Sequence, residues 1–262
     1  IATAVGNVDT FSGTPTATLG DAHTLAELVA INNAIGGTIT LNDVTVALSG
    51  STADVKAALA GTFAVAYSGN VTLSDANLAN VAAADINTIA GDTSGTVTVT
   101  NNINITGNSD VIATAVGNVD TFSGTPTATL GDAHTLAELK AINNALSGTL
   151  TLNDYTVALS GSSADVAAAL AGTFADTYSG TATLNDNHTL AELVAINNGT
   201  TGNITLNSNA VALTGSTSDV KAALAGNVGG VYTGNIVLND GNGTGIAATD
   251  ITTIESDTTG TI

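Results

Sequence analysis

The chain has 262 residues and a formal net charge of −19, because 22 Asp and Glu residues face only 3 basic ones, all of them Lys. Hydrophobic residues make up 44% of the chain but aromatic residues only 3%. The aliphatic content argues against disorder. Three cations are too few to bind nucleic acid, and the charge opposes an anionic membrane surface. The chain has no Cys, which excludes disulfides, and no stretch is apolar enough to predict membrane insertion.

Internal repeats organise the sequence. Residues 1–34 and 112–145 are identical except that Val29 is replaced by Lys140, and the sequence His-Thr-Leu-Ala-Glu-Leu occurs a third time at 188–193. A Gly followed by alternating Thr and aliphatic residues recurs every 22–32 residues, at Gly13, Gly37, Gly69, Gly95, Gly124, Gly148, Gly180, Gly202, Gly234 and Gly260. Repeats of this length are typical of solenoids.

The first complete unit, residues 37–68, begins with two runs that alternate between polar and apolar residues. The run Thr38–Leu41 predicts a half-buried strand with Ile39 and Leu41 facing the core. An Asn-Asp turn follows, and the run from Val44 to Leu48 predicts a second strand that ends at a Ser-Gly pair.

A helix is predicted in the rest of this unit. Ser51 and Asp54 form a variant of the capping box, which marks a helix start. Gly61 is placed to end the helix. Residues at helical spacing form the predicted buried face, namely Val55, Ala58 and Leu59.

Shorter units omit the second strand, as residues 124–147 illustrate. The run Thr127–Leu130 predicts a strand, and Thr135 with Glu138 forms a capping box. The apolar residues of the helix recur at the spacing of one buried face: Leu136, Leu139 and Ile142.

Alternating strands and helices at this period predict an α/β fold, because parallel strands must be joined by crossovers. We expect a solenoid of about nine strand–turn–helix coils, with a parallel β-sheet and a row of short helices. Residues 1–262 form one continuous repeat array in this interpretation, cut within a coil at both ends, and no signal peptide is visible.

Candidate catalytic residues are few. His23, His134 and His188 occupy one repeated position before a helix start. Two coils separate His134 from His188, which is too far to share a zinc ion. We interpret these His residues as a structural feature of the repeat. No motif of a known catalytic site occurs, and the sequence predicts that the protein is not an enzyme.

Aspartates follow many of the predicted strands, and stacked coils would align them in a ladder of like charges that a cation could stabilise. They are Asp21, Asp43, Asp75, Asp132, Asp154, Asp186 and Asp240. The segment 240–245 resembles the first half of a calcium-binding loop, but position 12 is Ile251 rather than Glu. We therefore predict calcium as the one candidate cofactor, with metal ligands Asp240, Asn242, Thr244 and Asp250; a plain surface turn is the alternative.

Thr-x-Thr pairs recur on the predicted strands, at Thr38 and Thr40, Thr96 and Thr98, Thr149 and Thr151, and Thr181 and Thr183. On a parallel sheet their hydroxyls would form outward ladders, which resemble the ice-binding faces of some β-solenoids. The alternative is that β-branched Thr simply suits an exposed strand.

Two segments resemble a family of repeats. Residues 84–89 and 92–97 read Ala-Asp-Ile-Asn-Thr-Ile and Asp-Thr-Ser-Gly-Thr-Val, and residues 249–254 and 257–262 echo them. They resemble repeat arrays of giant secreted cell-surface proteins of marine bacteria. The resemblance implies an extracellular or cell-surface location, secretion without a signal peptide and no catalytic residues.

These observations predict a structural extracellular protein: a solenoid segment of a surface fibre, sheath or filament that assembles end to end. Its expected partners are copies of itself or further repeats of the same chain, joined head to tail, and neither nucleic acid nor a membrane. The alternative is an adhesin stalk or a binding module for carbohydrate, ice or a cell surface.

Overall fold

The computed structural model describes residues 1–262 and has α/β structure, in which short strands pair in parallel and alternate with ten helices. The predicted fold class is therefore confirmed at the level of an α/β protein with parallel sheets. The chain divides into two compact units, Ile1–Thr129 and Leu130–Ile262, which are described separately. None of the helices combines the length and the apolar character needed to cross a membrane.

The first unit contains five helices and most of the paired strands. Its helices are α1 (Ala2–Gly6), α2 (Leu25–Ala34), α3 (Thr52–Leu59), α4 (Ala83–Asp92) and α5 (Ser109–Gly117). Its strands are β1 (Ala17–Thr18), β2 (Ile39–Thr40), β3 (Leu48–Gly50), β4 (Val71–Leu73), β5 (Asn80–Ala82), β6 (Val97–Val99), β7 (Asn104–Gly107) and β8 (Thr121–Phe122), and β9 (Thr127–Leu130) lies at its end.

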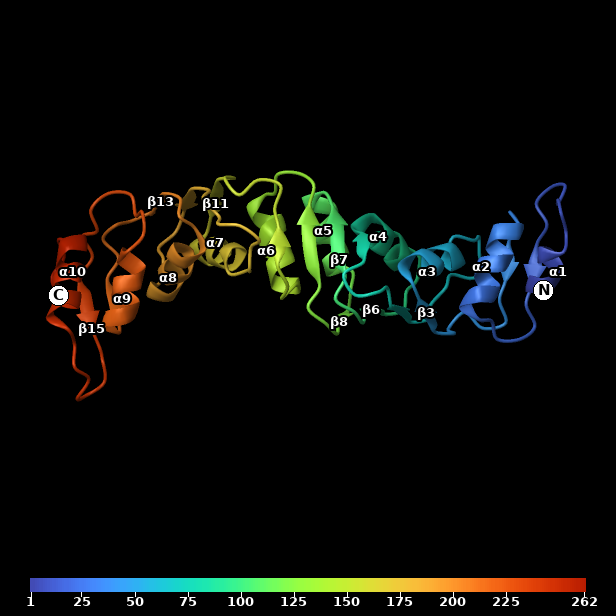
Figure 1. Cartoon of the computed structure of the whole chain (residues 1–262), viewed down its shortest axis with the longest axis horizontal. Helices are drawn as coiled ribbons and strands as arrows, with labels where there is room; N and C mark the ends of the chain where they lie inside the picture. Colours follow the sequence, from blue (N-terminus) through green and yellow to red (C-terminus); the bar gives the residue numbers. More distant parts are fainter. The chain divides into compact units, whose positions relative to one another are not determined.

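Neighbouring elements of this unit follow each other in chain order. β1 pairs with β2, the strands β3, β4, β6 and β8 form one sheet, and β5 pairs with β7, all in parallel. Each helix from α1 to α5 packs against the next one along the chain, as Figure 1 shows for α2 to α5.

The second unit repeats this arrangement. Its helices are α6 (Leu136–Ala145), α7 (Ser163–Leu170), α8 (Leu190–Gly199), α9 (Thr217–Leu224) and α10 (Ala248–Asp257). Its strands are β10 (Leu150–Thr151), β11 (Leu159–Gly161), β12 (Ala182–Leu184), β13 (Ile204–Thr205), β14 (Leu213–Gly215) and β15 (Ile236–Leu238). β11, β12 and β13 form a parallel sheet, β14 pairs with β15, and the helices again pack in chain order (Figure 1).

Helix starts agree closely with the sequence. Thr135 and Glu138 form the predicted capping box of α6, and the same box begins α2 and α8. Ser51 caps α3 by accepting a hydrogen bond from the backbone N–H of Asp54. The predicted buried faces are confirmed for Val55, Ala58 and Leu59 and for Leu139 and Ile142, whereas Leu136 is only half-buried.

The strand predicted at Thr127–Leu130 is confirmed as β9, whereas the two runs of the first unit form shorter strands than predicted. The run Thr38–Leu41 forms only the two-residue strand β2, although Ile39 is buried as expected. The second run is a correction: Val44 lies in a turn, and β3 begins at Leu48 and includes the Ser-Gly pair that was expected to end it. These positions pair with β4, so the neighbouring strand decides which residues are extended.

Candidate functional site

The residues predicted to bind calcium are partly brought together. Asp240, Thr244 and Asp250 line one surface hollow of about 380 Å³, which lies between α9 on one side and the β15–α10 loop with the start of α10 on the other. Asn242 is exposed in the same loop and does not line the hollow. The calcium site therefore stays a prediction, with three of its four residues on one surface.

The two carboxylates of this hollow already have protein partners. Asp240 accepts hydrogen bonds from the backbone N–H of Thr217 at 3.1 Å and from its hydroxyl at 2.6 Å, and these bonds lower the pKa of Asp240. The Asp250 carboxylate pairs with Lys221 Nζ at 2.6 Å. A cation entering the hollow would have to share or displace these donors. No group of three or more His, Asp or Glu side chains is arranged to hold a metal ion.

Four of the other strand-end Asp residues bind nearby backbone and hydroxyl groups of the protein. Asp75 accepts from the backbone N–H and the hydroxyl of Thr52, and Asp186 accepts from the backbone N–H of Ser163. Thr52 and Ser163 are the first residues of α3 and α7, so each carboxylate lies at a helix N-terminus, where a negative charge is stabilising.

A second group of these Asp residues closes local turns. Asp43 Oδ1 accepts from the backbone N–H of Thr45 at 2.8 Å, and Asp154 Oδ1 accepts from that of Thr156 at 2.7 Å. The hydroxyls of both Thr residues donate to the same carboxylate oxygens. Hydrogen bonding thus lowers the pKa of both Asp43 and Asp154, and it explains their position after strands without a bound cation.

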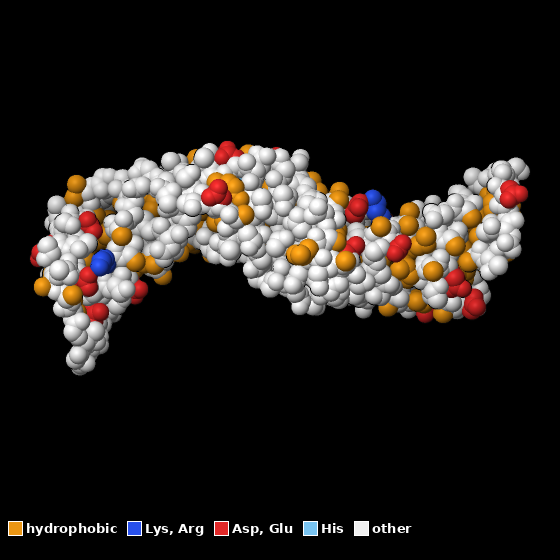
Figure 2. Space-filling model, viewed as in Figure 1, with side chains coloured by type: hydrophobic (Ala, Val, Ile, Leu, Met, Phe, Trp, Pro, Cys, Tyr) orange, Lys and Arg blue, Asp and Glu red, His pale blue; other side chains and the backbone are white.

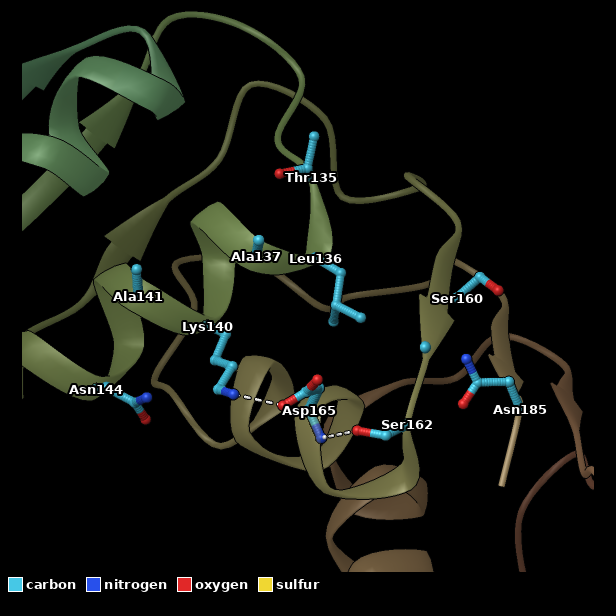
Figure 3. A pocket seen from close by; sticks show the side chains of 11 residues that line it. Thr135, Leu136, Ala137, Lys140, Ala141, Asn144, Ser160, Ser162, Asp165 and Asn185 are labelled. Carbon is cyan, nitrogen blue, oxygen red and sulfur yellow. Dashed lines mark hydrogen bonds and ion pairs between the residues drawn. The ribbon is translucent and has the colours of Figure 1, made fainter. Parts of the chain in front are cut away.

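A hollow of about 870 Å³ lies between α6 and α7 in the second unit (Figure 3). Lys140 and Asp165 form an ion pair across it, and the backbone N–H of Asp165 donates to the Ser162 hydroxyl. The rest of the lining combines small apolar side chains with hydroxyl and amide groups: Thr135, Leu136, Ala137, Ala141, Asn144, Ser160, Gly161 and Asn185.

Lys140 distinguishes this groove from its repeated counterparts. The residue equivalent to Lys140 is Val29 on α2 and Val194 on α8, and these helices are otherwise closely similar to α6. Val194 lines a smaller hollow with Leu190 and Asp219. Lys140 therefore gives this hollow an ion pair with Asp165, which Val29 and Val194 cannot form at the equivalent positions.

Every Lys of the chain bridges two consecutive helices. Lys56 of α3 pairs with Asp85 of α4 at 2.5 Å, Lys140 pairs with Asp165, and Lys221 of α9 pairs with Asp250 of α10. On the face drawn in Figure 2, basic side chains lie beside acidic ones and neither sign gathers into a broad patch. The bridges join residues 25 to 29 positions apart, so sequence spacing did not reveal them.

Thr side chains lie in register on some neighbouring strands, and two of them, Thr98 and Thr183, belong to the Thr-x-Thr pairs of the sequence. Thr72, Thr98 and Thr121 lie in register on β4, β6 and β8, and Thr183 pairs with Thr205 on β12 and β13. These side chains are exposed or half-buried. Neighbouring hydroxyls are thus spaced by the strand separation, about 4.8 Å.

The three His residues are buried, and each contacts a buried Tyr. His23 Nε2 lies 3.2 Å from Tyr67 Oη, His134 Nε2 lies 3.1 Å from Tyr178 Oη, and His188 Nε2 lies 3.0 Å from Tyr232 Oη. The interpretation of these His residues as a repeated structural feature agrees with this placement. The sequence did not reveal their Tyr partners, which lie 44 residues further along the chain.

Comparisons with known protein families, with curated proteins and with solved structures found no match to this chain.

Proposed function

We propose that this protein is a structural component of an extracellular fibre, sheath or surface filament, built as a solenoid whose repeats stack end to end. The regular succession of parallel strand pairs and sequentially packed helices within each unit supports the solenoid. The resemblance to repeats of secreted surface proteins, together with a cysteine-free acidic composition, supports an extracellular location.

The observation that carries this proposal is a difference in burial between identical sequences. Ile112 is 0% exposed and Val119 is 9% exposed, and α5, which contains Ile112, packs against α4. Their counterparts in the first copy, Ile1 and Val8, are 52% and 44% exposed. The same side chains are therefore core when a neighbouring repeat adjoins them and surface when none does.

The last helix, α10, is also less buried than its counterpart within the chain. α10 corresponds in sequence to α4, but Ile251 of α10 is half-buried where Ile86 of α4 is fully buried. Ile262 is also exposed, whereas its counterpart Val97 is buried in β6. Inside the chain, an α4-type surface covers an α5-type surface, so these two apolar faces fit each other. We infer that one copy of the chain can present its α10 face to the α1 face of another copy.

Sedimentation of residues 1–262 over a wide concentration range tests this association. We expect the average mass to rise with concentration, and negative-stain micrographs to show filaments. The double variant Val8→Asp, Ile262→Asp should abolish the rise, because it places charges on both faces. Val65→Asp with Val231→Asp is the matched control, since both residues are exposed apolar loop positions outside the segments 1–8 and 249–262.

Two results would count against end-to-end stacking. The first is a wild-type mass that stays monomeric at every concentration. The second is an equal loss of association in both double variants, which would indicate general stickiness of exposed apolar groups rather than a specific interface.

The groove that contains Lys140 favours a second candidate function, a binding module. Lys140 stands where the first copy of the repeat has Val29, and its ion pair with Asp165 lies among hydroxyl and amide groups, a combination that can hydrogen-bond to a carbohydrate. Glycan-array binding that is lost in Lys140→Val would support this function, and binding unchanged in that variant would exclude this groove as the site.

A further inference from the structure

Three copies of a buried His–Tyr cluster recur along the chain. In each, a His before a helix start contacts a Tyr hydroxyl, which donates to a backbone carbonyl oxygen that precedes a strand. The Tyr178 hydroxyl donates to Val157 O at 2.7 Å, and the Tyr232 hydroxyl donates to Val211 O at 2.6 Å. The His side chains are 2–4% exposed.

The hydrogen-bond pattern fixes the protonation of each imidazole. A Tyr hydroxyl has one hydrogen, and here it goes to the carbonyl oxygen. The His Nε2 must then carry a hydrogen and donate to the Tyr oxygen. The neutral ring leaves Nδ1 without a hydrogen, and in all three clusters this atom is buried and has no hydrogen-bond partner. A second proton on Nδ1 would therefore be buried without an acceptor.

The charged groups that face the clusters do not compensate for this burial. Asp43 and Glu27 face His23; Asp154, Glu138 and Asp132 face His134; Glu192 and Asp186 face His188. Their negative charges favour the imidazolium, but desolvation is the larger effect and lowers the pKa of each His below 6.5. Burial also raises the pKa of Tyr67 and Tyr232 to about 12, so both hydroxyls stay protonated.

We propose that the three His–Tyr clusters form an acid-sensitive device: each holds its repeat together at neutral pH and opens when its His takes up a second proton. Opening would release the loop that carries the Tyr from the segment that carries the His. In the first cluster, residues 61–67 would separate from the start of α2. The clusters would respond to acid in this way whatever the function of the protein.

The direction of the pH effect follows from linkage. Each His binds a proton more readily in the unfolded state, where its pKa is near 6.5, than in the folded state. The stability from the neutral cluster is therefore complete above about pH 6.5 and is lost as the pH falls below that value. Below this point each His should raise the unfolding constant by up to about tenfold per pH unit.

Denaturant unfolding of wild type and of the triple variant His23→Gln, His134→Gln, His188→Gln between pH 7.5 and 5 tests the device. Gln keeps an N–H donor for the Tyr oxygen but does not titrate, and the chain has no other His. We expect the unfolding constant of wild type to rise steeply below pH 6.5 and that of the variant to rise far less. Equal slopes would overturn the proposal, because carboxylates would then account for the whole response.

An NMR titration of the wild-type His ring protons needs no variant. We expect all three rings to remain neutral in the folded state well below pH 6.5 and to gain protons together with the loss of folded signal. Titration of the folded-state signals at or above pH 6.5 would overturn the proposal even where the triple variant fails to fold.

Discussion

At the scale of single residues, contacts from a neighbouring repeat explain Gly residues that the sequence alone presents only as helix ends. Gly61 was predicted to end a helix, and α3 does end at Leu59. The structure adds that the Asn32 side chain of α2 lies where a Cβ of Gly61 would be, and its amide donates to Ala57 O and Ala58 O at the end of α3. The same Asn–Gly contact recurs at Asn143 with Gly172 and at Asn197 with Gly226.

Leu78 is the one residue other than Gly with a positive φ, at 65°, and its side chain is 79% exposed. A Leu in the left-handed region is strained by about 1–2 kcal/mol, and Asn tolerates that region better. We predict that Leu78→Asn raises the free energy of unfolding by up to about 1 kcal/mol, measured by urea denaturation.

Val65→Asn is the matched control for Leu78→Asn. Val65 is also an exposed apolar loop residue, at 62%, but has no positive φ. We expect this change to stay within about 0.5 kcal/mol of wild type. An equal gain in both variants would mean that removing exposed apolar surface, rather than relieving strain, stabilises the protein.

At the scale of elements, helices were predictable because their signals are local. The capping box of Thr135 with Glu138 and the cap that Ser51 forms with Asp54 each involve residues three positions apart at the helix start. Strands depend on partners elsewhere in the chain, which is why β2 and β3 differ from the alternating runs. The candidate site followed the same rule: the loop at 240–245 was visible in the sequence, but the bond between Asp240 and Thr217, 23 residues away, was not.

The buried face of α6 supports a prediction that compares neighbouring residues. Leu139 is fully buried, so Leu139→Ala should lower the free energy of unfolding by about 2–5 kcal/mol through the cavity it leaves. Lys140 is partly exposed, and its ion pair with Asp165 is worth at most about 1 kcal/mol. Lys140→Val should therefore be nearly neutral, as Val29 and Val194 at this position indicate.

Thermal or urea unfolding of both variants checks this assignment of the helix faces. The two substitutions lie next to each other in one helix, so each serves as the control for the other. If Lys140→Val proved the more damaging change, the helix would have to present its other face to the core.

At the scale of the whole molecule, charge is the dominant feature. The formal net charge is −19, and each of the 3 Lys residues is already paired with an Asp. No other basic side chain offsets the remaining negative charge. Self-repulsion of this size destabilises a folded state, and salt screens it. We therefore expect sodium chloride to raise the melting temperature.

The predicted calcium site can be tested by comparing the melting temperature in calcium chloride with that in sodium chloride. If calcium binds at Asp240, Thr244 and Asp250, it stabilises the folded state beyond screening, because only that state forms the hollow. We expect calcium chloride to raise the melting temperature more than sodium chloride of equal ionic strength, and Asp240→Asn to remove most of that excess. Asp176→Asn changes the net charge equally in an exposed loop and should keep the excess. Because Asp240 already accepts two hydrogen bonds from Thr217, an identical response of wild type to both salts would mean that protein donors alone satisfy this carboxylate and that calcium has no site here.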